Sequence, residues 1–325
     1  MFGVNSTSAP VTSAGLIDSR LLGFFLVFNL LICSEILSLF GIAGNVVNII
    51  VFSKQGYKDS VNITLAALAV SNIGALVGQQ MFDIMVNPWF LNAHLPFNVT
   101  EVLRLISFYP HSYFIRVGGF ITAFASFERC LCVVAPLRVK RIITPGVALV
   151  VNVTIFIVTI LHVFPAMYTT YFDWKFSARQ NRTVLGVTLR STASSVFAVS
   201  YFITDLSVPY FTFLVLIACT SVTSVKLIDK ASWRKAVSGS DVSKKERKVV
   251  RMLSVVSVVF IVCLIPQSTI LTAVALVQGL KVDGAYFDVA MLCYSIAYLA
   301  ETVNTSVNVV VYYKMSTRYR ETLMR

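Results

Sequence analysis

Seven long apolar runs constrain this chain more than any other feature. A helix that rises 1.5 Å per residue needs about 20 apolar residues to cross ~30 Å of hydrocarbon. Only 13% of the 325 residues are charged, too few to cover a water-facing surface, so lipid must be the solvent for much of the chain. The pattern predicts an all-α membrane protein, a seven-transmembrane helix bundle. We place the spans at 22–53, 60–86, 101–134, 145–168, 197–228, 247–279 and 284–313.

The basic residues predict which side of the membrane each loop occupies. Of the 27 Lys and Arg residues, 19 lie in the segments that follow spans 1, 3, 5 and 7, and loops with this bias stay in the cytoplasm. We therefore expect an extracellular N-terminal tail at 1–21, a membrane domain at 22–313, and a short cytoplasmic amphipathic helix with the C-terminus at 314–325. The net charge of +12 then reflects topology, and we expect no nucleic-acid partner.

Glycosylation acceptors give an independent prediction of orientation, because sugar is added only on the lumenal side. The sequons at Asn5, Asn98 and Asn181 all fall on the predicted outside. They are the glycosylation candidates.

Cysteine and histidine usage limits the chemistry that we expect. The six cysteines lie in or beside spans, and the segment 169–196 between spans 4 and 5 has none, so we expect apolar core residues rather than a disulfide framework. The three histidines, His94, His111 and His162, lie in separate segments, and no Ser/His/Asp set is present. We expect no catalytic residues, no cofactor and no metal site.

Several polar residues, two prolines and Phe260 occur in the spans in the same order as in the rhodopsin-like (class A) G-protein-coupled receptors. Through these residues the sequence resembles that family over the whole chain. The residues that carry the resemblance are Asn45, Asn72, Glu128-Arg129, Pro209, Phe260, Pro266, Asn308 and Tyr312. Two short strings, at 128–133 and 312–316, are similar to chemosensory receptors of gastropod molluscs.

The resemblance implies a multi-pass plasma-membrane receptor, embedded in the lipid bilayer, that binds an extracellular ligand and activates a heterotrimeric G protein. The narrower resemblance implies a small polar chemosensory cue. In family members that keep an ionic lock, Arg129 pairs at rest with an acid at the place of Glu246; the alternative is that Glu246 is one solvated charge in the stretch 244–248. The other implied switch residues are Glu128, Phe260, Pro266, Asn308 and Tyr312. The implied intramembrane polar network comprises Asn45, Asn72, Asn304 and Asn308.

Several positions depart from the family pattern. Asn72 stands where the family has an aspartate that holds a sodium ion. Leu264 replaces the family's tryptophan in helix 6, and Val309 replaces its proline in helix 7. The helix 5 Tyr is Ile217, and the helix 3 Cys is Arg104, so the usual outer disulfide cannot form. These departures concern the switching details rather than the fold.

Charged residues inside spans are the best indication of the ligand. Each costs ~2.5–3.5 kcal/mol on insertion scales, so such residues tend to be paired or functional. The pocket candidates are Arg116, Asp205, Glu301, Asp83 and Arg104. By family register, Arg116, Asp205 and Glu301 lie where many receptors contact ligands, and together they suit a zwitterionic or amine-bearing molecule. The alternative is a salt bridge between Arg116 and Asp205 that only joins two helices.

Glu301, Asn304 or Thr305, Asn308 and Tyr312 follow steps of three and four, so they form one polar stripe on the seventh span. We expect this stripe to face the bundle axis, and the alternative is that some of its members only join helices.

The sequence leaves two alternative functions and argues against a third. A neuropeptide receptor of the same fold would bind a short peptide. A seven-helix transporter or channel would also use intramembrane charges, but it would not require Arg129 or a basic third inner loop. A retinal protein needs a lysine in the seventh span, and no lysine occurs from 284 to 313.

Overall fold

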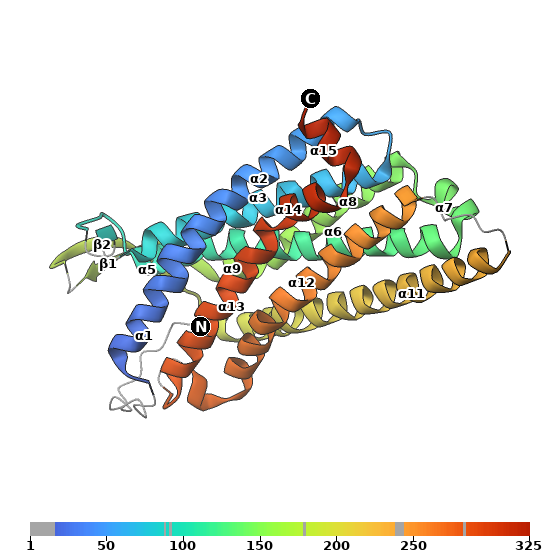
Figure 1. The fold of residues 1–325 in the computed structure, drawn as a ribbon. Coiled ribbons are helices and arrows are strands. Elements are labelled where there is room, and N and C mark those ends of the chain that lie inside the picture. The colour runs from blue at the N-terminus through green and yellow to red at the C-terminus, as the bar shows by residue number, and fades with distance from the viewer. Residues whose placement is uncertain (1–16, 88, 91–92, 178–179, 238–243, 282–283) are drawn as a thin grey trace.

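The computed structural model describes residues 17–87, 89–90, 93–177, 180–237, 244–281 and 284–325. Its long helices pack side by side in a bundle, with a small hairpin at one end (Figure 1). Six helical crossings are long and apolar enough to span a membrane among these residues. In chain order they are α1 (Ser19–Leu26), the π-helical η1 (Val27–Cys33) and α2 (Ser34–Gln55); α3 (Ser60–Val86); α5 (Val99–Leu103), the π-helical η2 (Arg104–Phe108) and α6 (Tyr109–Val134); α8 (Pro145–Thr159), the 3₁₀ turn η3 (Ile160–His162) and α9 (Phe164–Thr169); α10 (Ala193–Tyr201), the π-helical η4 (Phe202–Ser207) and α11 (Val208–Val237); and α12 (Lys244–Leu276).

The seventh crossing is divided into α13 (Phe287–Ser306) and α14 (Asn308–Met315). The break at Val307 occurs although Val309 replaces the proline expected of the family. Asn45 of the first crossing donates its side-chain amide to the carbonyl oxygen of Thr305 at 2.9 Å. A side chain that engages a backbone carbonyl competes with the helical hydrogen-bond ladder at that point. The division into two helices and the polar residues of α13 explain why this crossing is not among the six that are long and apolar enough to span a membrane.

The bundle is polar inside and apolar outside. Asn45, Asn48 and Ser71 are almost fully buried, whereas Val150 and Leu161 of the fourth crossing are 65% and 68% exposed. Only a hydrocarbon solvent makes that distribution favourable.

The two short helices α7 (Pro136–Ile142) and α15 (Thr317–Leu323) lie at the end of the bundle away from the hairpin (Figure 1). Ser316 caps α15 by accepting a hydrogen bond from the Tyr319 backbone N–H at 3.2 Å. The Tyr319 hydroxyl donates to Asn48 Oδ1 at 2.6 Å. The short helix expected after the seventh span therefore packs back onto the first crossing.

The segment between the fourth and fifth crossings forms a hairpin that an all-α prediction omits. Strands β1 (Thr170–Ser177) and β2 (Arg182–Leu189) pair antiparallel, with Thr170 opposite Leu189. Alternating aromatic residues at 172, 174 and 176 are the strand pattern in the sequence. These three side chains are all exposed on one face of β1.

Polar contacts attach the hairpin to the start of α5. Glu101 Oε2 accepts hydrogen bonds from the Val187 backbone N–H at 2.6 Å and from Lys175 Nζ at 3.0 Å. The backbone of Leu185 also bonds to the 96–98 segment. All six cysteines lie in described residues, and no disulfide joins any two of them. The Glu101 contacts therefore hold the hairpin near the place where the family has its disulfide.

Candidate functional site

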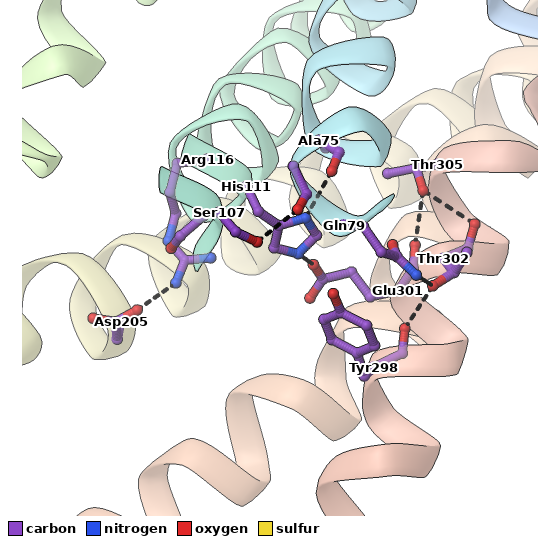
Figure 2. A network of polar contacts seen from close by, with 12 residues as sticks. Ala75, Gln79, Ser107, His111, Arg116, Asp205, Tyr298, Glu301, Thr302 and Thr305 are labelled. Carbon is purple, nitrogen blue, oxygen red and sulfur yellow. Dashed lines mark hydrogen bonds and ion pairs between the residues drawn. The ribbon is translucent and has the colours of Figure 1, made fainter. Parts of the chain in front are cut away.

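Two ion pairs connect the third crossing to its neighbours in the outer half of the bundle. His111 Nε2 lies 2.6 Å from Glu301 Oε1 on the seventh crossing. Five residues further along α6, an Arg116 guanidinium nitrogen lies 2.7 Å from Asp205 Oδ1 on the fifth crossing. The two α6 side chains point in opposite directions, as Figure 2 shows. The sequence-predicted trio of Arg116, Asp205 and Glu301 is therefore divided between two separate pairs.

The His111–Glu301 pair holds two protons, and the hydrogen bonds fix the place of one of them. His111 Nδ1 lies 2.8 Å from the carbonyl oxygen of Ala75. A carbonyl only accepts hydrogen bonds, so Nδ1 carries a proton. One further proton lies between Nε2 and the Glu301 carboxyl, either as imidazolium with carboxylate or as imidazole with carboxylic acid. The pair has no net charge in both cases, which is what a site with side chains 9% and 6% exposed requires.

Polar contacts between the second, third and seventh crossings surround this pair. Gln79 donates to Thr302 Oγ1 at 2.5 Å, and the Ser107 hydroxyl donates to the Gly78 carbonyl at 2.7 Å. A Cβ added at Gly78 would lie 3.0 Å from His111 backbone atoms, so glycine permits the close approach of α3 and α6. The Tyr298 ring lies 5.6 Å from the His111 ring.

Asp83 lies one helical turn from Gln79 toward the outside. Its side chain is 3% exposed, and neither carboxyl oxygen has a hydrogen-bond partner among the described residues. Glu35 and Tyr298 are close enough to interact with it electrostatically. A buried carboxyl without a hydrogen-bond donor is costly, so Asp83 stays a candidate for the ligand pocket. Arg104, the remaining pocket candidate, lies in η2 close to Tyr109.

The Arg116–Asp205 pair is further tied to its surroundings. Arg116 Nε donates to the Thr204 carbonyl at 2.9 Å, and the Thr204 hydroxyl lies 3.0 Å from Asp205 Oδ2. Both Thr204 and Asp205 belong to the π-helical η4, a type of irregularity that is frequent at functional sites. One turn before Arg116, the Ser112 hydroxyl lies 3.0 Å from His162 Nε2. The third crossing is thus bonded to the fourth, fifth and seventh.

The inner half of the bundle holds a network of amides. Asn72 donates to Asn45 Oδ1 at 3.2 Å, and Asn45 itself bonds to the carbonyls of Gly41 and Thr305. A cavity of about 10 Å³ adjoins this network, with Asn72, Asn304, Thr305 and Asn308 in its lining. That volume suits one water molecule. The lining contains no carboxylate, which makes it a poor site for a sodium ion.

The cytoplasmic end of the third crossing carries the predicted switch pair. An Arg129 guanidinium nitrogen lies 3.2 Å from Glu128 Oε1, and Glu128 also accepts from the Ser60 hydroxyl. Arg129 Nε is buried without a partner among the described residues. Glu246 belongs to α12, but its side chain lies outside the described ones, so the lock stays a prediction.

The remaining switch candidates lie in the core. Phe260 packs against Phe213, with ring centroids 6.4 Å apart, and a Cβ added at Gly119 would lie 3.2 Å from Phe260 Cζ. Pro266 lies within α12. Tyr312 is almost fully buried and its ring lies 5.5 Å from that of Phe52. All members of the predicted stripe on the seventh crossing are buried: Glu301, Asn304, Asn308 and Tyr312.

The glycosylation candidates differ in their surroundings. Asn181 is exposed at the hairpin turn, where its φ is +48°. Asn98 caps α5, and its side-chain amide donates to Glu101 at 3.0 Å. Asn5 lies outside the described residues.

His111 is the main site residue that the sequence reasoning missed. It lies eighteen residues before Arg129, which is five turns at 3.6 residues per turn. The two side chains therefore share one face of the third crossing. That spacing was the available signal.

One known family matches most of the chain. The sequence profile of the family described as 7 transmembrane receptor (rhodopsin family) matches residues 44–312. The match covers most of the chain and includes every residue of the two ion pairs. Among curated proteins, none matches.

Proposed function

Because this chain belongs to the rhodopsin family of seven-transmembrane receptors, we propose that the two ion pairs of its third crossing bind a small polar ligand and transmit that binding to a G protein. Family membership establishes the coarser function: a class A G-protein-coupled receptor, a multi-pass membrane protein typically of the plasma membrane, and not an enzyme. It also removes the transporter or channel as a rival. The ligand and the site residues are our proposal.

The observation that carries the proposal is the placement of two neutral ion pairs on one helix. His111 and Arg116 reach Glu301 and Asp205, which belong to the seventh and fifth crossings. Buried charges tolerate a change of partner better than the loss of one. A ligand that brings its own charges can therefore replace protein partners and change how these crossings are joined.

A zwitterion or an amine fits these groups best. Its ammonium group would meet Glu301 or Asp205, or the unpartnered carboxyl of Asp83, and a carboxylate would meet Arg116. Charge-assisted hydrogen bonds are strong at such low-dielectric positions. Amino acids and related small polar cues have this chemistry, which also agrees with the narrower resemblance to chemosensory receptors.

A route toward the cytoplasm begins beside Arg116. Gly119 lies one turn inward on α6 and packs on Phe260 of α12. Ser126, two turns further, is hydrogen-bonded to Ser257 of α12 at 2.6 Å. A ligand shifts the resting and active states only by its different affinity for each. A ligand that replaces Asp205 as the partner of Arg116 would provide such a difference in affinity. We expect α12 to be the helix that moves in response.

One observation favours a peptide ligand as the second candidate. The β1 strand exposes Phe172, Trp174 and Phe176 on one face, 53%, 65% and 68% exposed, and exposed aromatic residues are typical of peptide-binding surfaces. If the ligand is a neuropeptide, alanine at Trp174 will weaken the response while Arg116 variants have little effect.

A ligand screen tests the proposal directly. Cells that express the receptor with a promiscuous G protein should respond to a member of an amino-acid and amine panel. Asp83→Asn, Glu301→Gln and Arg116→Ala, at matched surface levels, should each shift the dose–response at least tenfold, about 1.4 kcal/mol per factor of ten. Ser194→Ala, at an exposed position of α10, is the matched control. Unchanged potency in all three variants would refute the pocket.

A further inference from the structure

A second cavity lies on the side of the bundle, between the third, fourth and fifth crossings. Its volume is about 650 Å³, within the ~300–1,000 Å³ typical of sites for small molecules. Most of its lining is aliphatic or aromatic, including Phe120, Val158, Leu161 and Val199. Neither Glu301 nor Asp83 lines it. It is therefore distinct from the polar site proposed for the extracellular ligand, although Arg116 contributes to both.

The cavity opens toward lipid rather than toward water. Leu161, Val199 and Ile203 line it and are also 68%, 60% and 51% exposed. In a membrane-spanning bundle, these exposed apolar side chains on η3, α10 and η4 face hydrocarbon. The helices α9 and α10, which also line the cavity, directly precede and follow the hairpin, so the opening lies in the outer leaflet. A molecule dissolved in that leaflet can therefore enter directly from the lipid.

The polar part of the wall has no net charge. Arg116 is paired with Asp205 at 2.7 Å and is bonded to the Thr204 carbonyl, and His162 is bonded to Ser112. A carboxylate that entered from the lipid would have to cross hydrocarbon as an unpaired charge, and an ammonium would also face the Arg116 guanidinium. A hydroxyl can accept from a guanidinium N–H without separating the pair, since arginine has five such donors.

We propose that this cavity binds an uncharged amphiphile from the outer leaflet, with one hydroxyl head directed to Arg116 and an apolar body between the fourth and fifth crossings. The size of the cavity and its apolar lining suit the apolar body of the amphiphile. The neutral Arg116–Asp205 pair suits its uncharged hydroxyl head.

Photolabelling of the purified, full-length receptor in phosphatidylcholine nanodiscs tests the proposal. Two alkyne-tagged, photoreactive alcohols are used, a sterol and a hexadecanol, each beside its deoxy counterpart. At least one alcohol should label peptides within 158–165 or 195–208 at least threefold more than its deoxy form. Excess untagged alcohol should suppress that labelling. No agonist is needed, so the result does not depend on the identity of the extracellular ligand.

Cavity-filling variants separate this site from ordinary contact with lipid. Val199→Trp should reduce labelling about fivefold, because the indole occupies the cavity. Val150→Trp places the same ring on exposed α8 surface outside the lining and should leave labelling unchanged. Ile203→Phe replaces Val199→Trp if the latter is not folded. Equal labelling by alcohol and deoxy probes would overturn the proposal, as would full labelling of the filled variant or labelling only elsewhere.

Discussion

The outer and inner halves of the bundle both hold polar groups inside hydrocarbon, but they pair these groups with different side chains. The outer half uses charged pairs, His111–Glu301 and Arg116–Asp205. The inner half uses amides and hydroxyls around Asn45, Asn72 and Asn48. A charge that loses its partner is far more costly than an amide that loses one. The outer half is therefore the part in which an incoming charged ligand changes the energy most.

The largest expected effect follows from breaking a charged pair on one side. Asp205→Ala leaves the Arg116 guanidinium without its counter-ion, and arginine cannot release its proton. We expect a loss of about 3–5 kcal/mol, measured as a lower melting temperature and reduced surface level. The apolar double variant Arg116→Met/Asp205→Leu should recover both.

Glu301→Gln is the matched comparison for that prediction. The glutamine can still hydrogen-bond to His111, and a histidine, unlike an arginine, can become neutral. Its stability should fall much less than that of Asp205→Ala. Normal stability in Asp205→Ala would show that the pair does not join the helices.

A second prediction places a charge in the inner half. Asn72→Asp puts a carboxylate beside the water-sized cavity, where an ionised acid costs ~2.5–3.5 kcal/mol without a partner. The variant should be less stable than wild type in potassium chloride and should recover in sodium chloride of equal concentration. The wild-type melting temperature should be the same in both salts, because no carboxylate lines the cavity. Sodium-dependent stability of the wild type would contradict the difference between the two halves.

The sequence was sufficient for the helix bundle, whereas the pocket residues that it suggests stay predictions. Apolar length locates the spans because lipid permits few other structures. It did not show that Glu301 pairs with His111, because that contact depends on how the third and seventh crossings are rotated about their axes. The lateral cavity could not be predicted either, since its volume depends on side-chain packing between three helices. The hairpin was omitted because its alternating pattern is short and lies between two strong helical signals.

A smaller effect is expected at the inner end of the amide network. Tyr319→Phe removes the hydroxyl that donates to Asn48 Oδ1 at 2.6 Å and leaves that oxygen without this donor. We expect a loss of about 1–2 kcal/mol, measured as the melting temperature of the purified receptor. Tyr313→Phe is the control, because Tyr313 is 46% exposed on α14. Equal melting temperatures for both variants would show that α15 contributes little to the bundle.

The smallest effect is expected at the cytoplasmic end of the bundle, where the polar residues are again charged but lie close to water. Arg129 already lies 3.2 Å from Glu128, so a resting lock with Glu246 would add a second acid rather than supply the first. A partly solvated pair contributes ~0.2–1 kcal/mol. Glu246→Ala should therefore raise ligand-independent G-protein activation by about fivefold at most, at matched surface level. Lys245→Ala, which removes a neighbouring charge of opposite sign, should not raise it, and Arg129→Ala should reduce agonist-driven activation. Equal basal activity in Glu246→Ala and wild type would leave Glu128 as the partner that holds Arg129 at rest.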